Sequence, residues 1–337
     1  MKLYCGIDLH SNNHYVTIID EDDRRIIDKR LNNDLTKTLS LLTHYRADLC
    51  GIAIESTFNW YWLVDGLMDA GYPVFLVNTC AVQQYDGLKY TDDKHDAFWL
   101  AHLMRLGILP TGYIYPKEQR GLRDLLRKRM QLVQYRTGQI LSIQNQFWRS
   151  LGQRLKSQDI KQGIELPITA LTDPNIRMAI QSNINVVQML NTQIDTLEQA
   201  VQRQCKNIPE YQQLQTVFGI GKILAQTITL ETGNIRRFNN AGQFASYSRC
   251  VGSKKTSNGK NKGKGNTKSG NKYLAWAFME AANAAINHYS QAKRFYQRKM
   301  AKRNVILARK ALAHKLARAS YYVMRDGVPF MPERLFL

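Results

Sequence analysis

Residues 3–31, LYCGIDLHSNNHYVTIIDEDDRRIIDKRL, decide the fold of the N-terminal part of the chain. The stretch contains three apolar runs, at 3–8, 14–20 and 25–31, separated by short polar turns. Apolar runs of this length with short polar connections are typical of antiparallel strands joined as hairpins. The stretch therefore predicts a three-stranded antiparallel meander.

The next segments alternate between helical and strand patterns. Leucines with helical spacing predict a helix over 34–45, and the compact apolar run at 49–54 predicts a buried parallel strand. Further patterns predict a helix over 60–70, a strand over 73–77 and a helix over 94–106. The order β-β-β-α-β-α-β-α matches the ribonuclease H-like layout, so we predict an α/β domain over residues 1–112.

The remainder of the chain is predicted to be mainly helical, with long helices over 118–156 and 176–205 and a basic helical tract over 292–325. A heptad spacing joins Val187, Leu190, Ile194, Leu197 and Val201. A seam of about two heptads fits either an intramolecular helical hairpin or a dimer contact. We predict a coiled-coil-like helical connector over 113–208 and a mainly α domain over 209–337.

Four acidic residues occupy positions that suit a metal site. Asp8 and Glu55 end apolar strands, and Asp93 and Asp96 lie where a helix begins. A carboxylate that ends a buried strand is costly unless a positive group meets it. Converging carboxylates supply the oxygen ligands that Mg²⁺ prefers. Taken one at a time, these residues are better explained by helix capping, for Asp92 or Asp93, and by solvated strand ends, for Asp8 and Glu55. Taken together on this order of strands and helices, they favour the metal site.

The register of the helical pair is open from spacing alone. Asp92 with Asp96, four apart, fits one helix face as well as Asp93 with Asp96, three apart. His95 is the one histidine that the sequence places near this chemistry, as a bystander or a phosphate contact.

The chain carries 47 Lys and Arg against 27 Asp and Glu, a net charge of +20 that favours a nucleic-acid partner. The basic residues concentrate between 252 and 272 and between 293 and 318. Those predicted to bind nucleic acid are Lys254, Lys255, Lys260, Lys262, Lys264, Arg294, Arg298, Lys302, Arg303, Lys310 and Lys315. Aromatic residues beside the second group that could stack on bases are Tyr289, Phe295, Tyr296, Tyr321 and Tyr322. The alternatives are a solvated loop and a solvated helix face with core tyrosines.

Hydroxyl groups in the first basic group are candidate nucleophiles, because lysines stabilise the charge that develops when a serine attacks a phosphodiester. Spacing does not choose among Ser253, Thr256, Ser257 and Ser269. Further upstream, Gly219-Ile220-Gly221 fits either a phosphate-binding helix-hairpin-helix turn or a plain turn between helices.

The five cysteines are odd in number and far apart, which argues against a disulfide framework or a zinc site. Cys5 and Cys50 are expected to be buried in strands. No apolar run is long enough to span a bilayer, so a soluble cytoplasmic protein without a membrane partner is expected.

Several motifs together resemble one family of mobile-element enzymes. The N-terminal motifs are Gly6-Ile7-Asp8, Ile54-Glu55-Ser56-Thr57 and Asp93-Lys94-His95-Asp96-Ala97. The C-terminal motifs include Phe218-Gly219-Ile220-Gly221, Gln243-Phe244-Ala245, the stretch from Val251 to Leu274, Ala313 to Ala319, and Gly327-Val328-Pro329-Phe330. With these, the chain resembles the DEDD-type insertion-sequence transposases related to the Piv invertase, the IS-one-ten (IS110) family including its IS-eleven-eleven branch.

The resemblance implies specific roles for residues. The N-terminal domain would be RuvC-like, with Asp8, Glu55, Asp93 and Asp96 holding Mg²⁺, two ions per composite site. The C-terminal transposase domain would supply Ser257 as the nucleophile that joins to DNA. Many members have glycine directly after this serine, whereas here Asn258 intervenes, so Ser253 stays an alternative.

The resemblance also implies partners. Members act on donor and target double-stranded DNA, bind a structured non-coding guide RNA, and assemble as homodimers and homotetramers whose site combines two subunits. Two alternatives remain open: a RuvC-like metal-dependent nuclease that uses water as the nucleophile, and a non-catalytic RNA-binding scaffold.

Overall fold

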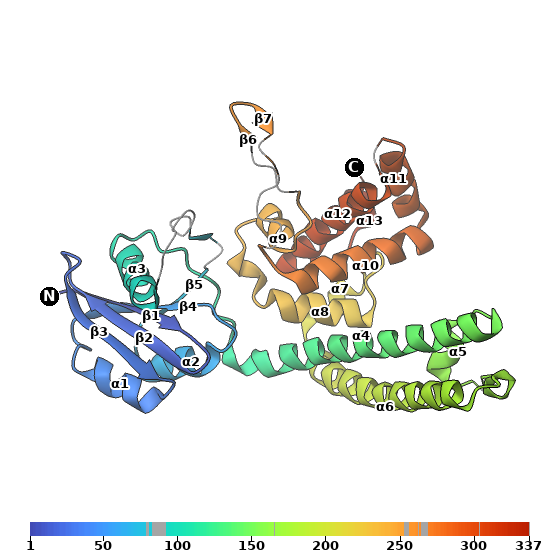
Figure 1. Cartoon of the computed structure of the whole chain (residues 1–337). Helices are drawn as coiled ribbons and strands as arrows, with labels where there is room; N and C mark the ends of the chain where they lie inside the picture. The colour runs from blue at the N-terminus through green and yellow to red at the C-terminus, as the bar shows by residue number, and fades with distance from the viewer. Residues whose placement is uncertain are drawn as a thin grey trace. The chain divides into compact units, whose positions relative to one another are not determined.

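The computed structural model describes residues 1–78, 81–82, 92–164, 166–252, 256–261, 263, 269–302 and 304–336, with 256, 257 and 261 described by their backbone alone. The chain forms two compact units, Met1–Lys117 and Glu118–Leu337 (Figure 1). The division into three regions, 1–112, 113–208 and 209–337, stays a prediction.

The first unit contains a mixed five-stranded sheet of order β3-β2-β1-β4-β5. Its strands are β1 (Leu3–Leu9), β2 (Asn13–Ile19), β3 (Arg25–Asn32), β4 (Leu49–Glu55) and β5 (Val74–Val77), and its helices are α1 (Leu35–Thr43), α2 (Tyr61–Asp69) and α3 (Asp93–Arg105). The first three strands are antiparallel, and β4 and β5 run parallel to β1. The predicted element order is confirmed, and it is compatible with a ribonuclease H-like domain.

The two faces of this sheet have different coverings, α1 and α2 on one and α3 on the other (Figure 1). Because side chains alternate along a strand, Cys5 and Ile7 pack in the core with α1 and α2, while Gly6 and Asp8 share the α3 face. Gly6 allows the close approach: a Cβ there would lie 1.9 Å from the Ala97 carbonyl oxygen of α3. This contact sets how near α3 comes to the end of β1.

We expect Gly6→Ala to destabilise the protein by at least about 3 kcal/mol, because the added methyl group meets helix backbone that cannot rotate away. The measurement is urea unfolding followed by fluorescence. Gly121→Ala is the matched control, since Gly121 lies in a helix with open space around its Cβ position and alanine there should stabilise by about 0.5–1 kcal/mol. A Gly6→Ala midpoint equal to that of the control would contradict the close packing of α3.

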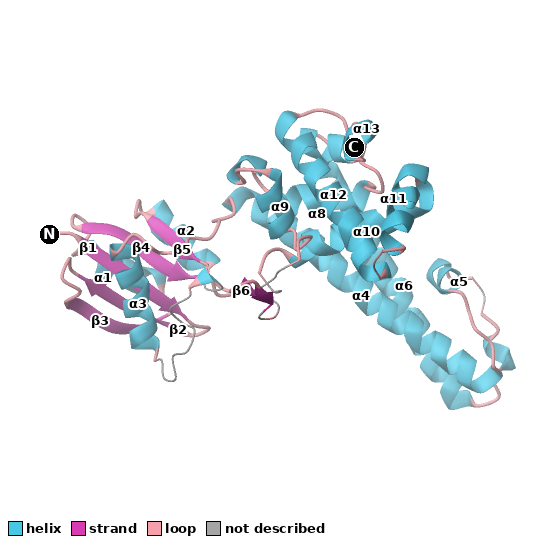
Figure 2. Ribbon diagram, turned by 90° about the horizontal axis from the view of Figure 1, so that it is seen from above, coloured by secondary structure: helices cyan, strands magenta, loops and turns pink. Residues whose placement is uncertain are grey.

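The second unit begins with two long helices, α4 (Lys117–Leu151) and α6 (Pro174–Cys205), connected through α5 (Ser157–Gln162) and the 3₁₀ turn Ile168–Ala170. The helices lie side by side in both views (Figures 1 and 2). Arg129 Nε donates to Glu198 Oε1 at 2.7 Å across the pair. The buried Val187 of the heptad seam packs with Ile140 and Ile143 of the same chain. Of the two alternatives, the seam therefore forms an intramolecular hairpin.

The rest of the second unit is mainly helical, as predicted. Its helices are α7 (Pro209–Leu214), α8 (Lys222–Thr232), a 3₁₀ turn (Ile235–Arg237), α9 (Ala241–Tyr247), α10 (Lys272–His288), α11 (Ser290–Met300), α12 (Val305–Asp326) and α13 (Pro332–Leu335), and its strands are β6 (Thr256–Ser257) and β7 (Lys260–Asn261). The single helical tract expected over 292–325 is wrong. It is two helices, because the Asn304 side chain accepts from the Leu307 amide and starts α12 anew.

The glycine turn before α8 has a packing role. Gly219 adopts φ +75°, and a Cβ there would lie 2.1 Å from the Ala281 carbonyl oxygen of α10. Only glycine combines this backbone angle with so close an approach. The geometry at Gly219 favours the plain turn between helices over a phosphate-binding turn.

The cysteines that the structure describes, Cys5, Cys50, Cys205 and Cys250, are all free. The expected burial of Cys50 is wrong: it is exposed at the start of β4, where it alternates with the buried Leu49. Among the described residues, no helix combines the length and the apolar character needed to cross a bilayer.

Candidate active site

The four predicted acidic residues come from neighbouring elements of the first unit. Asp8 lies near the end of β1 and is only 2% exposed. Glu55 is the last residue of β4, the parallel neighbour of β1. Asp93 and Asp96 lie in the first turn of α3, the helix that packs on β1. Strand ends and a helix start thus meet at one edge of the sheet.

Electrostatic effects on Asp8 show how close the carboxylates lie. Burial, a hydrogen bond with Glu55, and the charges of Glu55 and Asp96 raise the pKa of Asp8 to about 7. Burial and then the charge of Glu55 also raise the pKa of Asp96. Asp8, Glu55 and Asp96 therefore form one cluster, the acidic cluster, in which each negative charge disfavours the others.

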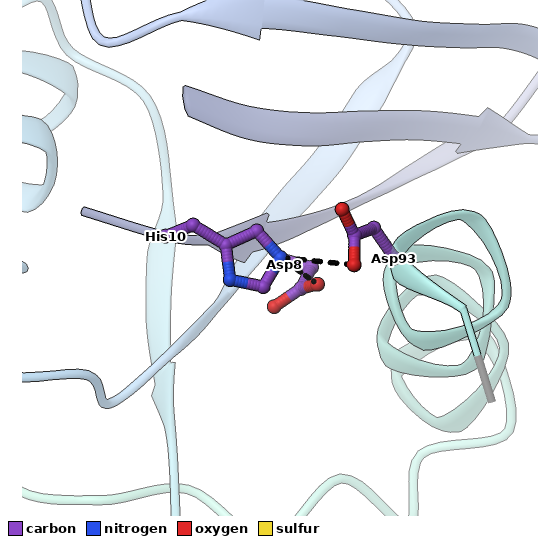
Figure 3. Close-up of side chains that lie close together, drawn as sticks. All are labelled: Asp8, His10 and Asp93. Carbon is purple, nitrogen blue, oxygen red and sulfur yellow. Dashed lines mark ion pairs between the residues drawn. The ribbon is translucent and has the colours of Figure 1, made fainter. Parts of the chain in front are cut away.

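His10 connects Asp93 to this cluster (Figure 3). Its Nε2 atom lies 3.0 Å from Asp8 Oδ2 and 3.1 Å from Asp93 Oδ1. The expectation that His95 is the only histidine near this chemistry is wrong, because His10 contacts two of the carboxylates directly. Local sequence patterns do not identify it, because β1 ends at Leu9 and the contact of His10 with Asp93 depends on the packing of α3.

Asp92 has a different role from its neighbours. Its carboxylate accepts from the His95 amide at 2.7 Å and caps the N-terminus of α3. Asp93 and Asp96 face β1 and β4. The pair at the site is therefore Asp93 with Asp96, as the family resemblance implies.

The donor set fits a hard divalent cation. Ligand atoms of Asp8, His10 and Asp93 lie within 4.8 Å of one another. The His10 Nε2 atom is buried between two carboxylate oxygens yet aligned for a hydrogen bond with neither. A buried Asp8 carboxylate beside Glu55 and Asp96 is costly unless a cation meets it. Oxygen-rich sets of this kind suit Mg²⁺, whereas a single imidazole does not make the set typical of zinc.

Ser257 lies in the second unit, directly before the tight turn of the β6–β7 hairpin. Ser257 pairs with Lys260, and the two residues between them, Asn258 and Gly259, have φ values of 48° and 70°. Positive φ at both positions defines a type I′ turn, for which Asn-Gly is the preferred pair. Asn258, which departs from the family pattern, therefore has a structural reason. The Asn-Gly pair is a local signal for this hairpin, which was not among the predicted elements.

The segment that carries this hairpin has its two ends held together. The Arg249 guanidinium donates to the Gly270 carbonyl oxygen at 2.8 and 3.0 Å, and the Asn271 amide donates to Tyr247 at 2.6 Å. The Asn271 side chain also donates to the buried Glu231 at 2.7 Å. The segment therefore starts and ends at one fixed point on the helical unit. Ser253, Lys254, Lys255, Lys262 and Lys264, which belong to it, lie outside the described residues.

The other predicted nucleic-acid contacts differ in exposure. Lys260, Arg294, Arg298 and Lys302 are exposed, Lys310 and Lys315 are half-buried, and Arg303 lies outside the described residues. Of the aromatic residues proposed to stack on bases, Phe295 and Tyr321 are buried in the helical core. Tyr322 is 42% exposed, which leaves it accessible to a ligand.

Comparisons with known proteins match both units of the chain. A DEDD-type IS110 family model described as "Transposase" matches residues 5–149, the range that contains the acidic cluster. A second model, "Transposase IS116/IS110/IS902 family", matches residues 211–297, which include the hairpin. A probable family 20 transposase from Pseudomonas aeruginosa is 23% identical over 298 residues, covering 84% of this chain and 86% of the relative.

These matches define the class of protein as an insertion-sequence transposase. The chain belongs to the IS110 family, whose two characteristic regions match it in order along the sequence.

Proposed function

We propose that this protein is an RNA-guided DNA recombinase that moves an insertion sequence by cutting and rejoining donor and target DNA through a covalent phosphoserine at Ser257. The single observation that carries the proposal is the convergence of Asp8, Glu55 and Asp96 with His10 and Asp93 at one sheet edge. The first unit would be RuvC-like, and Asp8, Glu55, Asp93 and Asp96 would hold Mg²⁺, two ions per composite site. When bound, these ions would stabilise charge on the phosphate and on the attacking and leaving oxygens.

The strand-cleavage step uses the Ser257 hydroxyl. Its oxygen loses a proton and forms a bond to the scissile phosphorus. The bond from phosphorus to the leaving sugar oxygen breaks, and that oxygen takes up a proton. In the joining step, a sugar hydroxyl of the partner strand attacks the phosphoserine and releases the serine. Neither step needs an external energy source, because one phosphodiester is exchanged for another.

We also propose a composite site, which the distribution of these groups along the chain supports. The acidic cluster belongs to residues 1–117 and Ser257 to residues 118–337, which are separate compact units. In the proposed homodimer or homotetramer, the serine of one subunit serves the acidic cluster of another. The exposed Arg294, Arg298 and Lys302 would contact the backbones of DNA and guide RNA. A cytoplasmic location stays a prediction.

The experiment that tests the reaction is trapping on a suicide DNA substrate. A nick near the scissile phosphate lets the leaving strand diffuse away, so a phosphoserine accumulates. The proposal predicts a denaturant-resistant protein–DNA adduct that requires Mg²⁺. Free cleaved ends without an adduct would indicate a nuclease that uses water, and binding without strand breakage would indicate an RNA-binding scaffold. For RNA guidance, a transcript of the DNA flanking the gene should co-purify with the protein and be needed for cleavage.

A further inference from the structure

A cavity of about 680 Å³ lies between α12 and the C-terminal segment 328–335, and no residue of the acidic cluster or the hairpin lines it. This volume is in the range of about 300–1,000 Å³ that binding sites for small molecules occupy. Residues of α12 and of the C-terminal segment line it, among them Arg318, Tyr322, Arg325 and Arg334.

The wall opposite α12 is held in place by three contacts. The Gln213 side chain donates to the Gly327 carbonyl oxygen at 2.5 Å. The Phe330 amide donates to the Thr216 hydroxyl at 2.9 Å, and Lys315 Nζ donates to the Leu335 carbonyl oxygen at 2.6 Å. The cavity is therefore preformed, which lowers the entropy cost of binding a ligand.

The charge of the cavity is strongly positive. It is lined by four cationic side chains and one carboxylate, Asp326, which Arg325 already pairs at 2.6 Å. Within the part of the chain that the structure describes, Arg318 and Arg334 have no ion-pair partner. Burial and then the charge of Arg318 lower the pKa of His314, which favours its neutral ring. Two arginines are thus available for an anionic ligand.

The cavity also exposes apolar and aromatic surface. Tyr322, Val328 and Met331 are 42%, 40% and 45% exposed. The Arg325 guanidinium lies 4.9 Å from the centre of the Tyr322 ring and restrains that ring from one side. Unpaired arginines beside an exposed aromatic ring are the combination that recognises a phosphate together with a flat base.

We propose that this cavity binds an unpaired nucleotide of a nucleic-acid strand, with its base against Tyr322 and its phosphate at Arg318 and Arg334. A base inside a duplex cannot present its face in this way, so the site selects single-stranded segments. An acidic peptide would pair with the arginines but would not use the aromatic surface. The inference rests on the proposed function only in taking nucleic acid as the partner.

The test is the affinity of the full-length protein for labelled strands of about ten nucleotides, oligo-U and oligo-dT, measured in EDTA so that no cleavage occurs. We expect Tyr322→Leu to weaken single-strand binding by about 5- to 100-fold with an unchanged salt dependence, since stacking releases no counterions. Arg318→Ala should weaken binding and also lower the slope of log affinity against log salt by about 1. If Tyr322→Leu weakens the binding of oligo-U more than that of oligo-dT, the bound strand is RNA. The opposite order identifies the bound strand as DNA.

The matched control is Arg203→Ala, which removes an exposed arginine of α6 that does not line the cavity. It should leave the single-strand affinity within about two-fold of the parent. The proposal is overturned if Tyr322→Leu weakens the binding of duplex and of single strands equally. It is also overturned if neither Tyr322→Leu nor Arg318→Ala weakens the binding of single strands. Displacement of the strand by polyglutamate at matched charge would assign the cavity to an acidic protein instead. Because this assay needs neither Mg²⁺ nor Ser257, its failure is distinct from a failure to form the phosphoserine.

Discussion

Ser257→Ala is expected to abolish the covalent protein–DNA adduct and to reduce strand exchange by at least about 10³-fold, because alanine offers no oxygen to bond to phosphorus. The fold should be unaffected, since Ser257 lies in a two-residue strand whose turn is set by Asn258 and Gly259 rather than by the serine side chain. The measurement is the yield of adduct on the suicide substrate, resolved by denaturing electrophoresis.

Two comparisons make this result specific. Ser253→Ala, in the same lysine-rich segment, should retain the adduct at close to the parent yield. Both variants should keep the parent affinity for DNA and guide RNA, because neither changes the charge of the protein. If Ser257→Ala still forms the adduct and Ser253→Ala does not, the nucleophile is Ser253. Adduct in both variants would exclude both serines.

Asp8→Asn is expected to inactivate the enzyme by at least about 10³-fold while making the metal-free protein more stable. The pKa of Asp8 is raised from 3.8 to about 7, so folding favours the protonated carboxyl. The charged Asp8 carboxylate therefore lowers the free energy of unfolding. This loss of stability is absent below about pH 4, grows between about pH 4 and pH 7, and is complete above about pH 7. In EDTA at about pH 8, removing the charge should therefore stabilise the protein by up to about 4 kcal/mol.

Thermal unfolding with and without Mg²⁺ measures both parts of this effect. Mg²⁺ should raise the melting temperature of the parent and not that of Asp8→Asn, because binding to the folded state alone stabilises it. Asp22→Asn is the control, since Asp22 is an exposed turn residue that forms a surface ion pair with Arg24. A Mg²⁺ response in Asp8→Asn equal to that of the parent would place the cation elsewhere.

Local patterns predicted the first unit well, for a physical reason. Its central strands are short, nearly continuous apolar runs between polar turns, and α3 begins at an aspartate cap, so each element is specified by neighbours in sequence. The ends of two of these runs placed Asp8 and Glu55 at strand ends. These patterns did not reveal His10, whose link to Asp93 depends on how closely α3 approaches β1 over Gly6.

Features that depend on long-range contacts could not be predicted. The Gln213 and Phe330 contacts that build the wall of the cavity join residues more than a hundred positions apart. The clamp between Arg249 and Gly270 likewise needs α9 and α10 to be packed first. The pattern of charges in the lysine-rich segment 252–272 has no period, so it predicts no strand or helix there. The Asn258-Gly259 pair within the segment carries the local signal for the hairpin turn.

The measurement that tests the central claim most directly is complementation between two inactive variants. Asp8→Asn supplies an intact serine, and Ser257→Ala supplies an intact acidic cluster. If one subunit's serine acts with the partner's acidic cluster, mixed assemblies contain one complete site, and strand exchange and adduct should return with all adduct on the Asp8→Asn polypeptide. If both variants stay inactive when they are co-assembled, no complete site has formed between subunits, and the composite arrangement is contradicted.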